Sequence, residues 1–155
     1  MISLAVVLAA ATAGRDACAL LQASEIAAVQ GEAPREMKPS EREEGALRIS
    51  DCVFVLPSFS RSISLEVIRG DGARGRWREM FHSRAESEEA ERKALEPEAV
   101  PGLGDEAFWI PEVPSGALYA LRKKAILRIS IGGKDPRHAK IARASALLRK
   151  ALRRL

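Results

Sequence analysis

Three short apolar segments between residues 100 and 133, separated by glycine and proline at hairpin spacing, constrain the fold more than any other stretch. The segments are Ala107 to Ile110, Ala117 to Arg122 and Ala125 to Ile131. In the last of them, Leu127, Ile129 and Ile131 point to one face, which is typical of a strand with one buried and one solvated side. We therefore predict a three-stranded antiparallel meander whose last hairpin turns at residues 123–124.

The remainder of the chain predicts two more strands and three helices. The strands are Cys52 to Leu56 and Ser62 to Ile68, and the helices are residues 19–30, residues 77–95 and a closing helix capped by Asp135-Pro136. Gly31 is placed to end the first helix. Residues 32–50 are polar and contain two prolines, so we expect an exposed loop with at most a short edge strand near Leu47 to Ile49.

This order of elements, α-β-β-α-β-β-β-α, predicts an α+β fold. We expect a mainly antiparallel sheet of about five strands with the helices packed on one face. A chain of 155 residues is long enough to bury one hydrophobic core, and we do not expect it to form two domains. Residues 14–155 are therefore expected to form one domain.

The first residues have the character of a secretory signal. Residues 2–13 are uncharged and end in Ala11-Thr12-Ala13, a small-x-small pattern that signal peptidase accepts, so we predict a signal peptide over residues 1–13, removed after Ala13. The run is too short to cross a bilayer as a helix. It lacks the usual preceding basic residues, and a buried apolar N-terminal helix is the alternative. The prediction is an exported protein, periplasmic or secreted, without a transmembrane span.

Cys18 and Cys52 are the only cysteines. In an exported protein an even pair predicts a disulfide. This one would close a loop of 33 residues and stabilise the fold by roughly 3 to 4 kcal/mol. The alternative is lipidation of Cys18, but the preceding Arg15-Asp16-Ala17 is not the short apolar lipobox that lipoprotein processing requires.

Charge is distributed unevenly along the chain. Residues 122–155 contain 12 Lys or Arg and one acid, a net charge of +11, whereas residues 1–121 contain 13 basic and 20 acidic residues, a net charge of −7. The basic end predicts contact with an anionic envelope component or an acidic protein, and not with nucleic acid if the protein is exported. The residues chosen for this contact are Arg143, Arg149, Lys150, Arg153 and Arg154. The alternative is that they complement the helix dipole and keep the surface soluble.

No residue pattern indicates catalysis. Gly102 and Gly104, followed by Asp105, precede a strand and lack the third glycine and the lysine of phosphate loops, so we interpret them as a structural turn with positive φ. His82 and His138 have no zinc-ligand spacing with the cysteines. We therefore predict no catalytic residue, no metal and no cofactor.

Two aromatic residues of the meander are candidates for a ligand surface. Trp109 and Tyr119 belong to adjacent predicted strands and could present their rings together. Core or cross-strand packing is the ordinary alternative for such residues.

Three segments together resemble one group of proteins. They are CALLQASEIAAVQG from Cys18, DCVF from Asp51, and PGLGDEAFW from Pro101. The chain resembles small exported bacterial proteins of unknown function, many of them lipoproteins. The resemblance implies an α+β domain similar to PsbP-like or lipoprotein-type antiparallel folds, with Cys18 bridged to Cys52, and brings no catalytic residues.

Two functional hypotheses follow. The first is a non-enzymatic exported domain that binds or scaffolds in the cell envelope through its sheet face or its basic closing helix. The alternative is a small-molecule binding protein or minor enzyme, with a pocket between the 107–131 meander and the 77–95 helix.

Overall fold

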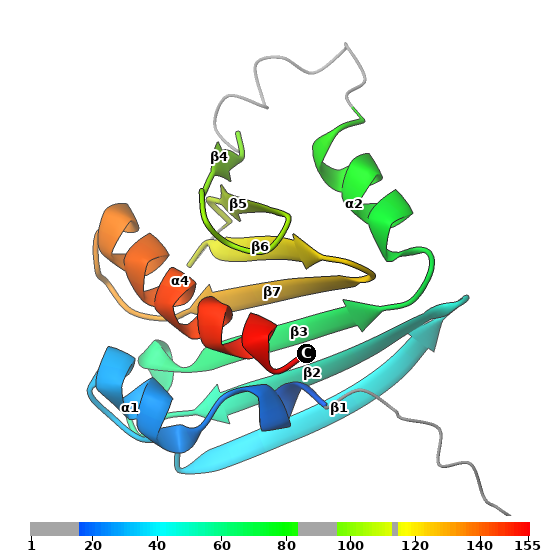
Figure 1. The fold of residues 1–155 in the computed structure, drawn as a ribbon. Helices are drawn as coiled ribbons and strands as arrows, with labels where there is room; N and C mark the ends of the chain where they lie inside the picture. Colours follow the sequence, from blue (N-terminus) through cyan, green and yellow to red (C-terminus); the bar gives the residue numbers. More distant parts are fainter. Residues whose placement is uncertain (1–15, 84–95, 113–114) are drawn as a thin grey trace, which may run out of the picture.

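The predicted meander forms part of a larger antiparallel sheet. The computed structural model describes residues 16–83, 96–112 and 115–155, and seven strands among them pair in the order β1-β2-β3-β7-β6-β5-β4 (Figure 1). The strands are β1 (Glu36–Glu44), β2 (Leu47–Val55), β3 (Ile63–Arg69), β4 (Glu98–Ala99), β5 (Glu106–Ile110), β6 (Ala117–Arg122) and β7 (Ala125–Ile131). The α+β class is confirmed, with seven strands in place of about five.

The middle strand, β7, has the bounds that its alternating pattern predicts. Leu127, Ile129 and Ile131 are buried on one side of the sheet, which we call the first face. Ile126 points to the opposite side, the second face, because side chains alternate along a strand, and it is buried there in a separate cluster. Arg128 lies on the second face and stays partly exposed. The second face is therefore solvated only in part.

The segment expected to be an exposed loop is a long hairpin. Residues 32–50 contain all of β1 and the start of β2, and the two strands pair from Glu36 with Val55 to Glu44 with Leu47. Gly45 forms the turn with a φ of 58°. All nine residues of β1 are exposed, so the strand has no buried side to impose apolar alternation. The loop prediction was wrong because this edge strand is held by its backbone pairing to β2.

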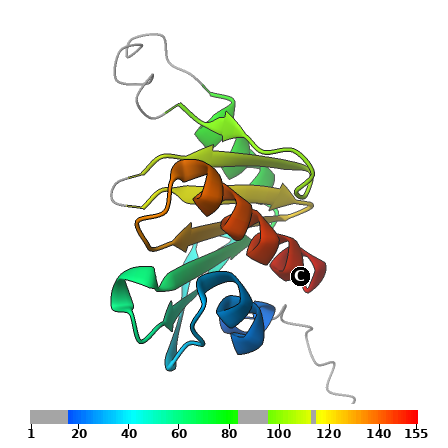
Figure 2. The same cartoon turned by 90° about the vertical axis from the view of Figure 1, so that its left-hand side faces the viewer.

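The helices cover both faces of the sheet. The short 3-10 helix η1 (Ala17–Leu20), α1 (Ala23–Gln30) and α4 (Arg137–Arg153) pack on the first face, whereas α2 (Ala73–Phe81) lies on the second (Figures 1 and 2). We expected all helices on one face. α2 differs because Trp77 and Phe81 pack against Phe108 and Tyr119, which point to the second face.

The bounds of α2 also differ from the prediction of residues 77–95. The helix begins at Ala73, includes Gly75 and ends at Phe81. Ala73 is fully buried, which explains why the helix starts one turn before Trp77. Residues 84–95 of the predicted helix lie outside the described residues.

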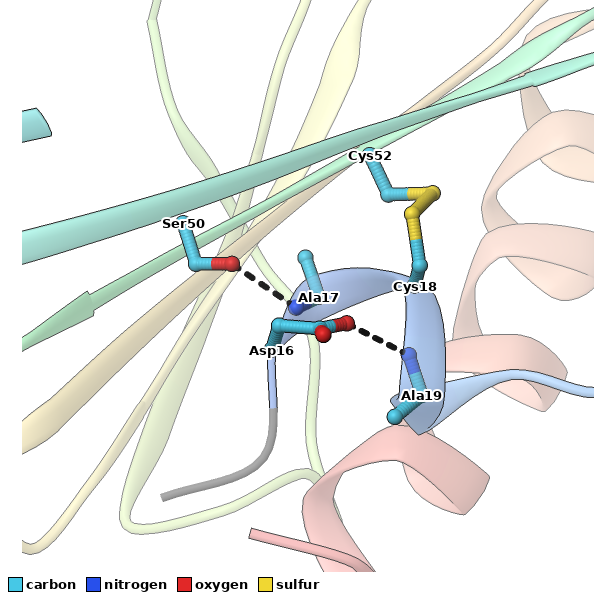
Figure 3. Close-up of a disulfide and its surroundings, with 6 residues drawn as sticks. All are labelled: Asp16, Ala17, Cys18, Ala19, Ser50 and Cys52. Atoms are coloured by element: carbon cyan, nitrogen blue, oxygen red, sulfur yellow. Dashed lines mark hydrogen bonds between the residues drawn. A yellow bond between two sulfur atoms is a disulfide. The ribbon is translucent and has the colours of Figure 1, made fainter. Parts of the chain in front are cut away.

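A disulfide anchors the N-terminal helices to the sheet. Cys18 in η1 is bonded to Cys52 in β2, with 5.1 Å between their Cα atoms, so the predicted pairing is confirmed (Figure 3). Beside it, the Ala17 amide donates to Ser50 Oγ at 2.8 Å, and the Asp16 side chain caps η1 by accepting from the Ala19 amide at 3.0 Å. The bridge and the hydrogen bond together fix η1 on the first face.

The ends of the other helices combine expected and unexpected features. Gly31 ends α1 in a left-handed conformation, with a φ of 81°. At the start of α4, Pro136 and not Asp135 is the N-cap, and no side chain caps the helix there. Asp135 instead accepts a hydrogen bond from Arg143 at 2.8 Å. The cap prediction was wrong because a guanidinium one to two turns into the helix takes the carboxylate.

The predicted signal peptide, residues 1–13, lies outside the described residues. Within residues 16–83, 96–112 and 115–155, no helix is long and apolar enough to cross a membrane.

Candidate functional site

The basic residues predicted for an anionic partner divide into two sets. Arg154 donates to both oxygens of Glu25 and also to the Leu20 carbonyl at 2.9 Å, which ties the end of α4 to α1. The Arg154 hydrogen bonds lower the pKa of Glu25 to about 2. Lys150 lies 3.9 Å from the same carboxylate. Together with Arg143, which pairs with Asp135, these cations have partners inside the fold.

The other two predicted residues, Arg149 and Arg153, are exposed on α4. Arg153 lines a cavity of about 360 Å³, which we call the basic pocket. The pocket lies where three segments meet: the end of β3, the hairpin between β6 and β7, and the last turn of α4. Its lining residues are Arg69, Gly70, Arg122, Lys123, Lys124, Ala125, Leu152, Arg153 and Leu155. Five of them are cationic, and none is acidic.

Two of these cations have partners that leave their charge only partly available. Lys124 forms an exposed ion pair with Asp71 at 2.5 Å, and this pairing raises the pKa of Lys124. Arg122 donates to the Leu152 carbonyl at 2.7 Å and so satisfies one of the free carbonyls at the end of α4. That contact agrees with the dipole interpretation of the basic residues.

The other three cations are less compensated. Within the described part of the chain, Arg69, Lys123 and Arg153 form no ion pair, and Arg69 Nη2 is buried without a hydrogen-bond partner. Burial lowers the pKa of Arg69, since it removes water from the charged form. Lys123 is exposed at the hairpin tip with a φ of 53°. A buried guanidinium nitrogen without an acceptor is an unmet hydrogen bond, which is uncommon in folded proteins.

The second face of the sheet offers a weaker electrostatic attraction than the basic pocket, which lies beside α4 on the first face. On its solvated part, Arg42 contacts Asp51 at 2.6 Å and Glu66 at 3.3 Å, and Arg128 pairs with Glu112 at 2.6 Å. Burial, with Asp51 beside it, raises the pKa of Glu66. Because these charges neutralise one another, the sheet face has less net charge to offer a partner than the basic pocket has.

A second cavity lies between α2 and the meander, where the alternative hypothesis places a pocket. This α2 pocket has a volume of about 250 Å³, and its lining is Arg74, Trp77, Arg78, His82, Asp105, Glu106 and Leu121. Glu106 Oε1 accepts from Trp77 Nε1 at 2.5 Å and lies 2.6 Å from His82 Nε2. Both contacts lower the pKa of Glu106, and the contact with His82 has the larger effect. The pocket therefore contains a histidine and carboxylate pair that is accessible to solvent.

The turn beside the α2 pocket has the conformation expected of its glycines. Gly102 and Gly104 have φ values of 79° and 55°. A Cβ on Gly104 would lie 2.4 Å from the Leu121 carbonyl oxygen, so the turn needs glycine both for conformation and for space. Asp105 Oδ2 accepts from the Lys123 amide at 2.9 Å and from Arg74 at 3.0 Å. These contacts lower the pKa of Asp105.

The two aromatic candidates do not form one surface. Trp109 pairs with Leu118 across the strands, and Tyr119 pairs with Phe108, so the two side chains lie on opposite faces. Both are buried, and burial raises the pKa of Tyr119 to about 12. Their contacts are those of core residues.

Residues 16–83, 96–112 and 115–155 contain no group of three side chains arranged to hold a metal ion. His138 is exposed on α4, away from the His82 and Glu106 pair. Arg69 is the one cation of the basic pocket that lies outside the predicted basic stretch, residues 122–155. It lies in the acidic part of the chain, and only strand pairing brings it beside the basic hairpin.

No protein-family model, curated protein or solved structure matches the chain.

Proposed function

We propose that the protein is an exported, non-enzymatic domain that binds an anionic component of the cell envelope in the basic pocket. The observation that carries the proposal is a cavity of about 360 Å³ with five cationic lining residues and no acidic one. Arg69 strengthens it, because strand pairing adds this cation to the four that come from the basic stretch.

The proposal locates the binding in the pocket and not along the whole closing helix. Arg143, Lys150 and Arg154 are engaged with carboxylates of the same fold, so an external anion would have to compete with Asp135 or Glu25 for them. The pocket cations require no such exchange, apart from Lys124 with Asp71.

The exported location rests on the disulfide. Stable disulfides form in oxidising compartments and are rare in the reducing cytosol, and Cys18–Cys52 joins two buried elements of the fold. The outer surfaces of cells and the bacterial envelope contain abundant phosphate and carboxylate groups, which are the anions that Arg and Lys recognise.

A titration with inorganic pyrophosphate, followed by NMR, tests this function. We expect shifts concentrated at the amides of residues 69–70, 122–125 and 152–155, and much weaker binding when NaCl is raised from roughly 50 mM to roughly 500 mM. Arg153→Ala should weaken binding, whereas Arg149→Ala, which removes the same charge one turn earlier on α4, should not. Equal effects of the two variants, or no shifts at these amides, would overturn the proposal.

The α2 pocket supports a second function, a small-molecule binding protein or minor enzyme. The observation in its favour is the exposed His82 and Glu106 pair in a cavity of about 250 Å³. A ligand that depends on apolar contact with Leu121 should remain bound at high salt. His82→Ala should weaken its binding, whereas Arg153→Ala should not. Screening of a neutral fragment library by NMR would detect it, and a lack of shifts near His82 would count against this function.

A further inference from the structure

We infer that the basic pocket recognises an amphiphile, namely a phosphate monoester whose dianionic head group contacts the cations while an apolar chain lies against Leu152 and Leu155. The inference rests on the proposed function, since it names the class of anion that the pocket would take.

The first step is the mixed lining of the pocket. Ala125, Leu152 and Leu155 lie beside the five cations. Leu152 is buried, whereas Leu155 is one of the few large hydrophobic side chains of the described residues that is exposed, at 39%. An exposed leucine at the rim of a charged cavity gains from contact with an apolar ligand group, because that contact removes both surfaces from water.

Second, the volume of the basic pocket is larger than a bare phosphate ion needs. Binding pockets for small molecules typically have volumes of about 300 to 1,000 Å³, and the basic pocket, at about 360 Å³, falls in this range. A bare tetrahedral oxyanion would leave most of that volume unfilled. A ligand that also brings several carbon atoms would fill it and reach the leucine side chains.

The third step is the charge of the head group. Arg69, Lys123 and Arg153 have no carboxylate partner within the described part of the chain, so more than one positive charge is available. A single carboxylate would compensate one of them, whereas a phosphate monoester near neutral pH has close to two negative charges. Its oxygens also match the forked donors of arginine.

Calorimetric titrations with three soluble probes test the inference: octyl phosphate below its aggregation concentration, inorganic phosphate, and the neutral octyl glucoside. We expect octyl phosphate to bind about tenfold or more tightly than inorganic phosphate, because part of its chain leaves water. Octyl glucoside should not bind measurably. Leu155→Ser should reduce the affinity for octyl phosphate more than that for inorganic phosphate, whereas Arg153→Ala should reduce both.

The outcomes separate this inference from the proposed function. Equal affinities for octyl phosphate and inorganic phosphate would overturn the amphiphile and leave the anion site standing. If neither octyl phosphate nor inorganic phosphate binds, both the amphiphile inference and the proposed anion site are overturned. A parallel assay with phosphatidic acid vesicles distinguishes a membrane lipid from a free phosphate ester as the source. Binding to vesicles without binding to monomeric octyl phosphate would show attraction to a charged surface, and would overturn recognition in the pocket.

Discussion

Two groups of basic side chains from the C-terminal third of the chain have opposite relations to the fold. Lys150 and Arg154 reach Glu25 on α1 and stabilise the contact between α1 and α4, and Arg143 pairs with Asp135 just before α4. Lys123 and Arg153 gather around a cavity whose lining includes no acidic side chain. Residue type and position on a basic stretch therefore do not decide whether a cation is available to a partner. The position of the nearest acid in three dimensions decides it.

Glu25 shows how the difference arises. The residue lies on α1, 129 positions from Arg154, and it is held beside the end of α4 by the packing of the two helices on the first face. The basic pocket lies at the other side of the same helix end, where the neighbours are β3 and a lysine-rich hairpin. One helix end thus combines an internal ion pair with a surface of excess positive charge.

The test with the largest expected effect on stability removes the disulfide that anchors η1 to β2. In Cys18→Ser/Cys52→Ser, loss of the bridge over a separation of 34 residues should lower the free energy of unfolding by roughly 3 to 4 kcal/mol. Chemical denaturation measures this change. Pyrophosphate affinity of the folded variant should stay within about twofold of wild type, because none of the lining residues is in η1 or α1. A large loss of affinity would show that the pocket depends on the disulfide-anchored helices.

The next test removes one structural cation. Arg154→Ala deletes the hydrogen bonds to Glu25 and to the Leu20 carbonyl, and we expect a loss of about 2 to 3 kcal/mol in the free energy of unfolding. Arg149→Ala is the matched control on the same helix and should change it by less than about 0.5 kcal/mol. Similar melting temperatures for the two variants would contradict the division into two groups.

Acid titration should report the same ion pair with a smaller effect. The folded-state pKa of Glu25, about 2, lies below its ordinary value of 4.5, so the stabilising contribution is present above pH 4.5 and is lost as the pH falls towards 2. We expect Glu25→Gln to remove roughly 1 kcal/mol of this pH dependence, after allowance for solvent screening. Thermal unfolding at several pH values measures it. Parallel curves for wild type and variant across this window would show that Glu25 is not the group that titrates.

The strands that could be predicted from the sequence are those whose buried positions are occupied by apolar residues. β6 and β7 have the expected bounds because their apolar residues mark the buried sides of the sheet. β1 is as long as β2, but all of its side chains are exposed, so its sequence contains turn-like and charged residues without alternation. Backbone hydrogen bonds to β2 hold it, and these do not depend on residue type.

α2 shows a second limit. The helix was predicted to begin at residue 77, yet it begins directly after Gly72 and includes Gly75. A glycine inside a helix costs about 1 kcal/mol relative to alanine, which the burial of Ala73, Trp77 and Phe81 can offset. Local propensity was the weaker term, and the tertiary contact that outweighs it is not visible in the sequence.

The candidate site was predictable only as a charge excess. The basic stretch was evident, but the neutralisation of Arg154 by Glu25 and the contribution of Arg69 both depend on contacts between distant segments. The Glu112 partner of Arg128 and the Asp71 partner of Lys124 are equally remote from any sequence rule.

Substitution of Lys123, which lines the basic pocket, should change stability least while testing directly whether the pocket binds anions. Lys123 has a φ of 53°, a left-handed conformation that costs a residue with a side chain about 1 kcal/mol. In Lys123→Gly the backbone strain is relieved while the charge is removed, so the free energy of unfolding should change by less than about 1 kcal/mol. Pyrophosphate affinity should fall severalfold, and its salt dependence should become shallower. Because Lys123 is not part of α4, this loss could not arise from a weakened helix dipole, and an unchanged affinity would favour the dipole interpretation of the basic residues.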